Sequence, residues 1–228
     1  MRRAARTLAA ALCAAGMFGV AWTITVWVWQ DPFTALYTTW QQAKLERSLD
    51  REIAAYRAPF RAETSSVREQ ELVAAAAARD RSELKVGQAL GRIVIPRMHL
   101  SIVVVNGTDE AALEKGPGRY LGSAMPGQGQ LVYIAGHRTT YLAPFAHIDA
   151  LRKGDRITLE LPYATFVYRV TGHRVVRADD LAVLRSHGYE LLELQACHPR
   201  FFATHRYIAY AKPVEVIPTG QRAYVPSA

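Results

Sequence analysis

An uncharged run near the N-terminus constrains the fold of this chain more than any other feature. Residues 7–29 contain no aspartate, glutamate, lysine or arginine. Coiled as an α-helix, that run is roughly 34 Å long, which matches a bilayer hydrocarbon core of about 30 Å. Arg2, Arg3 and Arg6 precede it, and short basic flanks favour the cytoplasmic side. We therefore expect residues 1–30 to form a cytoplasmic tip and a transmembrane anchor, with the rest of the chain outside the cytoplasm.

Two other uses of this segment fit its length and composition less well. A cleaved signal peptide normally has an apolar core of only about 7–15 residues. Lipid attachment at Cys13 would need a small residue before the cysteine, and Leu12 is bulky. A retained single-pass anchor is the better interpretation of the run.

Residues 31–87 have a helical pattern of a different kind. Apolar side chains recur every four positions among mixed charges, as in a helix with solvated faces. These side chains are Leu45, Leu49 and Ile53. Residues 69–85 contain an alanine run that also favours helix. Because Pro32 ends the first helix and Pro59 separates the other two, the sequence predicts a helical stalk or linker between the membrane and a folded domain.

From Gly91 onward the pattern changes to short runs rich in β-branched residues, separated by glycine and proline turns. Such runs occupy 91–96, 101–105, 131–135, 156–161, 165–176, 191–197 and 206–216. Several short strands with few helices predict a mainly β fold, a closed or nearly closed β-barrel. We expect residues 88–217 to form this domain and residues 218–228 to form a C-terminal tail.

Cysteine usage indicates a free reactive thiol. One cysteine, Cys13, lies in the apolar N-terminal run, and the other, Cys197, ends an apolar run in the β region. Cysteines outside the cytoplasm are usually paired, so a single one there suggests a thiol kept for chemistry. A nearby imidazolium or guanidinium increases the thiolate fraction of such a thiol. His137 and Arg206 lie at the ends of other β-type runs and are the candidates for those two groups.

The alternation of side chains along a strand predicts where the thiol points. In the run that ends at Cys197, Leu192, Leu194 and Ala196 share one face, which must be the core. Cys197 is on the opposite face, and the same reasoning places His137 on the outer face of its own run. We therefore expect both side chains to stand on an outer groove of the barrel.

Three segments resemble one known family. The sequence Ala-Gly-His-Arg-Thr-Thr-Tyr at 135–141 is similar to the histidine segment of class E sortases, and residues 116–129 resemble the loop before it. Cys-His-Pro-Arg-Phe at 197–201, together with Arg206, resembles the cysteine–arginine segment of that family. The resemblance covers residues 91–216 and the arrangement of anchor and linker.

The resemblance implies a membrane-anchored cysteine transpeptidase with an eight-stranded sortase barrel over residues 88–217. By position, Cys197 would be the nucleophile, His137 the general acid and base, and Arg206 the residue that binds the oxyanion or positions the substrate. Such enzymes cut the sorting signal of a secreted protein between threonine and glycine, and pass the acyl group to an amine of the peptidoglycan precursor or cross-bridge. In class E the signal resembles Leu-Ala-X-Thr-Gly. No cofactor is implied.

One departure from the family pattern affects the nucleophile segment. Sortases usually carry Thr-Leu-X-Thr-Cys, whereas this chain has Glu-Leu-Gln-Ala-Cys at 193–197. Both threonines are absent, including the one directly before the nucleophile. Activity or specificity could therefore differ from that of the family, and an inactive sortase-like binding module is one alternative.

Other functions fit the pattern less well. An L,D-transpeptidase also places its histidine before its cysteine, but its Ser-His-Gly-Cys-X-Arg context is not matched by Ala196 and His198. In papain-like hydrolases the cysteine precedes the histidine. A sortase that polymerises pilins would differ only in its acceptor, a lysine of the next subunit.

Neither a metal nor a nucleic acid is expected as a partner. The paired Cys-X-X-Cys or His-X-X-X-His spacing of zinc ligands is absent around Cys197, His198 and His205. The net charge of +8 comes from scattered residues without a basic stripe interleaved with aromatics. For an external domain, such a charge favours attraction to an anionic cell envelope.

Overall fold

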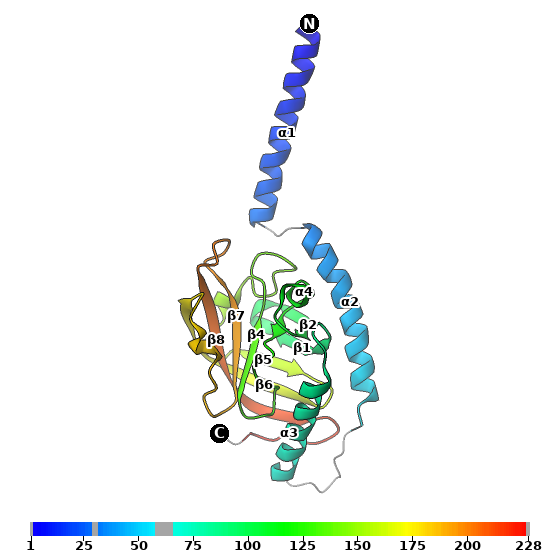
Figure 1. The fold of residues 1–228 in the computed structure, drawn as a ribbon, viewed down its shortest axis with the longest axis vertical. Coiled ribbons are helices and arrows are strands. Elements are labelled where there is room, and N and C mark those ends of the chain that lie inside the picture. Colours follow the sequence, from blue (N-terminus) through cyan, green and yellow to red (C-terminus); the bar gives the residue numbers. More distant parts are fainter. Residues whose placement is uncertain (1, 29–31, 58–65, 227–228) are drawn as a thin grey trace.

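The computed structural model describes residues 2–28, 32–57 and 66–226. Figure 1 shows a long N-terminal helix that stands away from a β-barrel, with two further helices beside the barrel. The three helices are α1 (Arg2–Val28), α2 (Pro32–Ala55) and α3 (Ser66–Glu83). The barrel follows them in the chain.

Helix α1 contains most of the uncharged run, and its described side chains are exposed. The part Arg2–Ile24 is long and apolar enough to cross a membrane, and none of its most apolar window is buried inside the molecule. The apolar surface of α1 therefore has no protein core to cover it. The prediction of one apolar N-terminal helix that ends before Pro32 is confirmed, whereas Pro59 lies outside the described residues.

Eight strands close into a single barrel in the order β1-β2-β3-β4-β7-β8-β6-β5. They are β1 (Ala89–Ile95), β2 (Leu100–Asn106), β3 (Gly118–Arg119), β4 (Leu131–Ala135), β5 (Arg156–Glu160), β6 (Ala164–Arg177), β7 (Leu191–His198) and β8 (His205–Pro218). The pairs β2–β3 and β4–β7 are parallel, and the other neighbours are antiparallel. Short helical turns connect them: η1 (Pro96–Met98), α4 (Glu110–Leu113), η2 (Ile148–Ala150) and η3 (Leu181–Leu184). The predicted mainly β, eight-stranded barrel is confirmed.

Side-chain alternation separates an inner core from an outer layer on β4 and β7. Their inward residues belong to the main core cluster: Val132, Ile134, Leu192, Leu194 and Ala196. The outward residues Leu131, Tyr133 and Ala135 of β4 form a second apolar cluster with Val183 of η3. The inward and outward faces predicted from the sequence are therefore confirmed for both strands, and the outer face is the one that can carry a site.

A buried arginine holds the glycine- and proline-rich loop before β4. Arg119 is 2% exposed, and its guanidinium donates to Asn106 Oδ1 at 2.8 and 3.1 Å and to the Ser123 carbonyl at 2.5 Å. Burial lowers the pKa of Arg119 to about 10, because desolvation disfavours the charged form. The hydrogen bonds compensate for part of that cost and tie residues 119–123 to the end of β2.

Helix α2 lies against the barrel, so the expected stalk is wrong in one respect. Its residues are helical as predicted, but Leu45 and Leu49 are buried against Val103 and Val105 of β2. A spacer standing in solvent would leave this apolar stripe exposed, and burial against β2 is the favourable alternative. Residues 32–55 are therefore a covering layer of the domain.

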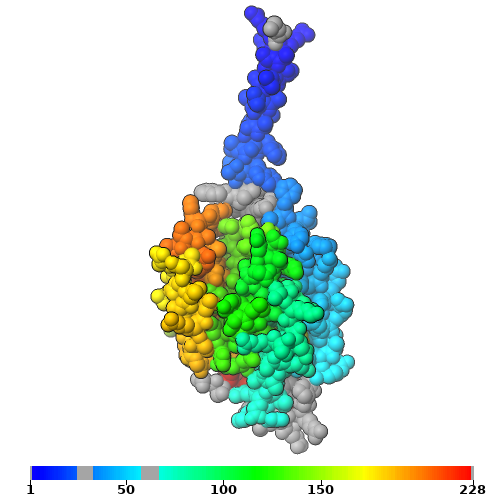
Figure 2. Space-filling view, viewed as in Figure 1, coloured from blue at the N-terminus to red at the C-terminus, as the bar shows by residue number. Residues whose placement is uncertain are grey.

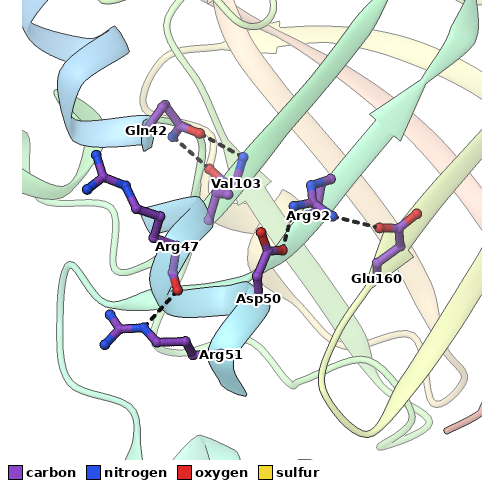
Figure 3. Close-up of polar contacts among 7 residues, drawn as sticks. All are labelled: Gln42, Arg47, Asp50, Arg51, Arg92, Val103 and Glu160. Carbon is purple, nitrogen blue, oxygen red and sulfur yellow. Dashed lines mark hydrogen bonds and ion pairs between the residues drawn. The ribbon is translucent and has the colours of Figure 1, made fainter. Parts of the chain in front are cut away.

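Polar contacts set the position of α2 along β2. The Gln42 side chain accepts from the Val103 amide at 2.8 Å and donates to the Val103 carbonyl at 3.0 Å, so the two residues pair as neighbouring strands would (Figure 3). Farther along α2, Asp50 forms an ion pair with Arg92 of β1 at 3.0 Å. Arg92 also pairs with Glu160 of β5 at 3.2 Å. The Arg92 contacts are partly exposed and contribute little to stability by themselves, but the buried Gln42 contacts specify one register.

Helix α3 and the C-terminal tail also pack on the barrel. Val73, Ala76 and Ala77 of α3 belong to the main core cluster. Beyond β8 the chain folds back, and the Val216 and Tyr224 backbones exchange hydrogen bonds of 2.8 Å in both directions. The folded unit thus extends on both sides of the predicted 88–217 domain.

We predict that Leu49→Ala lowers the free energy of unfolding of the whole domain by about 2–5 kcal/mol, because Leu49 is fully buried between α2 and β2. Urea unfolding followed by tyrosine and tryptophan fluorescence measures this. The matched control is Glu46→Ala, an exposed position on the same helix that should change stability little. Equal stability of the two variants would mean that α2 is an independent spacer.

Candidate active site

Cys197 and Arg206 face each other on neighbouring strands. Cys197 is the penultimate residue of β7, Arg206 is the second residue of β8, and their Cα atoms are partners in the antiparallel ladder. Directly opposed residues project from the same face of a sheet, with Cβ atoms about 4.5–5.5 Å apart. The thiol and the guanidinium, nine positions apart in the sequence, therefore share the outer face at one end of the barrel.

His137 reaches the same level through the parallel pairing of β4 with β7. Leu131 pairs with Leu191, and Ala135 pairs with Gln195, so the register is constant along the ladder. The Gly136 amide continues the ladder by donating to the Gln195 carbonyl at 3.0 Å. Carried one residue further, this register sets His137 level with Cys197. The three residues predicted from the sequence therefore lie at adjoining strand ends on one end of the barrel.

Gly136 is required by a close approach of the neighbouring loop. A Cβ atom at this position would lie 2.7 Å from the ring of Phe145, which is fully buried. The Phe145 amide donates to the His137 carbonyl at 3.0 Å and brings the loop back across the strand end. Any larger residue at 136 would push this loop, and the histidine with it, away from β7.

The His137 ring is half-buried and covered by Tyr141. The two ring centroids are 5.1 Å apart at an angle of 37°. His137 Nε2 is buried and has no hydrogen-bond partner among the described residues. Burial lowers the pKa of His137 below its ordinary value, against the opposing effect of the Glu114 and Glu110 carboxylates. A neutral imidazole with a free nitrogen is suited to exchanging a proton with a bound substrate.

The segment that carries Tyr141 has an unusual backbone. Tyr141, Leu142 and Ala143 have φ of 51°, 62° and 40°, in the left-handed region that residues with a side chain seldom adopt. Side-chain contacts hold the first of them: Tyr141 Oη donates to Glu114 Oε1 at 2.9 Å, and its amide donates to Thr34 Oγ1 at 3.2 Å. Helix α2 and the α4 turn thus support the tyrosine that covers the histidine.

Arg138 joins the loop after His137 to strand β7, and sequence reasoning missed it. The side chain is 3% exposed and donates to the Cys197 carbonyl at 3.3 Å and to Asp149 Oδ2 at 2.5 Å. Its Nη1 also lies 2.9 Å from His198 Nδ1, which must accept because arginine can only donate. His198 is therefore held as a structural partner of Arg138. An arginine directly after the candidate histidine, within an apolar region, was the available signal, because a buried arginine needs several acceptors.

A groove of about 300 Å³ lies on the outer face of the barrel beside these residues. Its lining includes Tyr120, Tyr133, Ala135, Leu181, Gln195 and Arg206. Within the groove, Tyr133 Oη donates to Gln195 Oε1 at 2.6 Å. Cys197 follows Gln195 by two residues on the same face, so the groove leads along β7 toward the thiol.

The Arg206 guanidinium binds backbone carbonyls of its own strand end. Its Nη1 donates to the carbonyls of Ala203 at 2.8 Å and His205 at 3.0 Å. In the described parts of the chain, no hydrogen bond joins Cys197, His137 and Arg206 to one another. Arg206 retains further N–H donors for a bound oxyanion or peptide carbonyl.

The two positions where the family has threonine lie in different environments. Ala196 is fully buried and faces the barrel core, so it does not line the groove. Glu193 is also fully buried, and none of the described residues donates a hydrogen bond to its carboxylate. The Nε2 atom of His187 lies 3.5 Å from Glu193 Oε1. Desolvation raises the pKa of Glu193 to about 7. The departure from the family pattern thus changes one core position and one buried position on the outer face of β7, and neither lines the groove.

A metal centre has no counterpart in the described residues, which contain no group of three or more His, Cys, Asp or Glu side chains placed to hold an ion. The site as it stands offers a thiol, an imidazole and a guanidinium. Together these groups can support covalent acyl transfer.

Comparison with known proteins gives one consistent family. A family model described as Sortase domain matches residues 93–214. Sortase D of Bacillus subtilis is 36% identical over 134 residues, which cover 57% of this chain and 66% of that protein. Sortase SrtE1 of Streptomyces coelicolor is 29% identical over 148 residues, or 58% of this chain and 42% of that protein. The matches thus span about two fifths to two thirds of the length of these relatives.

Solved structures agree at the level of the fold. Sortase E1 of Streptomyces coelicolor, solved with a tripeptide in its active site, is 27% identical with a TM-score of 0.55, over 60% of this chain and 95% of that one. A sortase D5 transpeptidase of Clostridium perfringens has a TM-score of 0.60 at 24% identity, over 76% of this chain and 98% of that one. The second comparison supports the fold alone.

We predict that Arg138→Met lowers the free energy of unfolding by about 1–3 kcal/mol, because it leaves the buried acceptors at Cys197 and His198 without their donor. Thermal or urea unfolding measures the change. Arg177→Met is the matched control, since Arg177 also pairs with an aspartate but is 77% exposed. Equal effects of the two substitutions would contradict the structural role of Arg138.

We predict that Glu114→Gln lowers the pKa of His137 further, because it removes a carboxylate that stabilises the imidazolium. NMR titration of the His137 ring protons in the full chain measures both values, and the unsubstituted protein should titrate below the ordinary histidine pKa of about 6.5. Glu46→Gln, an exposed change on α2, should leave the titration in place. An upward shift in Glu114→Gln would contradict this account.

Proposed function

The chain belongs to the sortase family of cysteine transpeptidases, and on that premise we propose that it cleaves a C-terminal sorting signal and transfers the acyl group to a cell-wall amine. The observation that carries the proposal is the register of three strands. Because β7 pairs with both β4 and β8, Cys197 and Arg206 lie opposite each other and His137 lies at the adjoining strand end, beside the groove that Arg206 lines. Each residue then has a distinct role in the reaction.

In the acylation half, Cys197 acts as the nucleophile. Its thiolate attacks the carbonyl carbon of the threonine in the signal, and a C–S bond forms while negative charge develops on the carbonyl oxygen. Arg206 donates hydrogen bonds to that oxygen and remains protonated throughout. His137, in its imidazolium form, gives its proton to the departing glycine nitrogen as the C–N bond breaks. The products are a thioester on Cys197 and a peptide with a new N-terminal amine.

In the transfer half, His137 acts in the opposite direction. The incoming amine attacks the thioester carbon, neutral His137 accepts its proton, and the C–S bond breaks to release the thiolate. Because burial lowers the pKa of His137, the neutral form needed here is favoured at neutral pH, and the imidazolium needed for acylation is scarce. More acidic conditions should therefore favour acylation, because they increase the imidazolium form of His137. This holds as long as Cys197 is still a thiolate.

The substrate class is part of the same proposal. The histidine and cysteine segments resemble those of class E sortases. This resemblance favours a signal similar to Leu-Ala-X-Thr-Gly. The compared relatives include sortases D and E. We propose α1 as a single-pass anchor with a cytoplasmic N-terminus, residues 88–217 as the catalytic domain, and peptidoglycan precursor or cross-bridge as the acceptor. Secreted proteins with the signal would be the donors.

We predict that the full chain in detergent gains the mass of the acyl fragment when it is incubated with a Leu-Ala-X-Thr-Gly peptide and no amine acceptor is added. Intact-mass spectrometry detects this thioester, which Cys197→Ala should abolish because no other described thiol lies in the barrel. Hydroxylamine should release the fragment, as expected for a thioester.

A folded protein that binds the peptide without cleaving it would instead support a binding module. Cleavage only of a different signal, for example a Leu-Pro-X-Thr-Gly peptide, would leave the transpeptidase in place and overturn the class E assignment. Reaction with wall tetrapeptides alone would favour an L,D-transpeptidase.

A further inference from the structure

The first turns of α2 present an apolar stripe that the barrel does not cover. The stripe residues recur at the spacing of one helix face, and they are Phe33, Leu36, Tyr37 and Trp40, which we call the α2 stripe. They are 73%, 72%, 39% and 53% exposed. The opposite face of the same turns is buried on the barrel, with Thr38 donating to the Glu114 carbonyl at 2.7 Å. Because α2 is held from its other face, the α2 stripe points away from the barrel.

Polarity changes along α2 in the way a bilayer interface would require. Phe33 and Trp40 are roughly 10 Å apart along the helix, comparable with the depth of about 5–10 Å to which interfacial helices insert. The next exposed residue on this face is Lys44, whose Nζ lies 3.3 Å from the centroid of the Trp40 ring. Exposed charged residues such as Glu46 and Arg47 follow. An aromatic segment followed by a lysine is typical of a chain that leaves a membrane.

A second aromatic group lies at the tip of the β7–β8 hairpin. Phe201 and Phe202 are 46% and 76% exposed, and the Arg200 guanidinium carbon lies 5.7 Å from the centroid of the Phe201 ring. These three residues form what we call the hairpin tip. Both the hairpin tip and the start of α2 lie at the end of the barrel that faces α1 (Figure 2). Aromatic rings beside a cation suit the headgroup region of an anionic membrane.

The candidate active site opens at this same end. Cys197 and Arg206 flank the hairpin tip on β7 and β8. On the other side, Thr34, one residue after Phe33, accepts from the Tyr141 amide, and the Tyr141 ring covers His137. One aromatic group therefore adjoins the cysteine and arginine, and the other adjoins the histidine.

We propose that this end of the barrel rests on the bilayer surface, with the α2 stripe and the hairpin tip inserted into the lipid interface on either side of the active site. The inference rests on the proposed function of α1 as a membrane anchor. The partner is a lipid surface because the α2 stripe begins where the apolar α1 helix gives way to the barrel and is joined to it by the Trp22–Phe33 ring contact of 5.6 Å. Lys44 and Arg200 would meet anionic headgroups.

A site held at the bilayer surface would change how both substrates reach it. A site held at the surface would receive acceptors that are themselves tethered to lipid, since both reactants would be confined to one thin layer. Donor proteins that remain attached to the membrane by their C-terminal segment would be presented in the same layer. The aromatic groups would thus act on substrate encounter and leave the chemistry at Cys197 unchanged.

The test places a nitroxide label at Phe202→Cys or Leu36→Cys in the full chain, with Cys13→Ala and Cys197→Ala to remove the native thiols. The protein is reconstituted in nanodiscs of phosphatidylcholine and phosphatidylglycerol. Electron paramagnetic resonance then compares relaxation by oxygen, which concentrates in lipid, with relaxation by a water-soluble nickel chelate. We expect both labels about 5–10 Å below the phosphates. Arg222→Cys, an exposed position in the C-terminal tail, is the matched control and should remain in water.

Every other result overturns the proposal. Labels at positions 36 and 202 that are as accessible to nickel as the label at 222 would show that the site is held away from the bilayer. Dipolar broadening between labels would show that these surfaces join two copies of the chain. Failure of the chain to enter nanodiscs would overturn the anchor and this inference together. Since the labelled protein lacks Cys197, none of these results depends on whether the transpeptidase chemistry is correct.

Discussion

The parallel ladder between β4 and β7 is the interaction on which the site depends. It is one of only two parallel pairs among the described strands, and it brings together strand ends that are 60 positions apart, as in the pairing of Leu131 with Leu191. In a closed barrel no edge is available for slippage, and a shift of one residue would turn every side chain to the opposite face. The same constraint therefore protects the core and keeps His137 level with Cys197.

Buried polar groups hold the loops that this ladder leaves open. Arg138 ties the histidine loop to the Cys197 carbonyl, and Arg119 ties the loop before β4 to Asn106. Each arginine is almost fully buried, so removing it would leave several acceptors without a donor. Tyr141 adds a third link, because it touches α2 through Thr34 and covers His137. Helix α2 and the His137 ring are thus parts of one contact network.

Much of this arrangement was predictable because it follows from local pattern. The uncharged run 7–29 required an apolar helix, and the period-2 runs after Gly91 required strands. Alternation alone placed Leu192, Leu194 and Ala196 inward, and the core cluster contains all three. The stalk was wrong because helical periodicity shows that a face is apolar but not which surface covers it. The roles of Cys197, His137 and Arg206 stay predictions, supported by their places at adjoining strand ends on one end of the barrel.

The sequence by itself determined the long helices, most of the strands in their order, the outward face of Cys197, and the free thiol, since these depend on residues close together in the chain. Only the tertiary structure decided that β7 lies between β4 and β8, that α2 covers β2, and that Arg138 donates to the Cys197 carbonyl. Those contacts join residues tens of positions apart. Their geometry is set by barrel closure, which no local periodicity encodes.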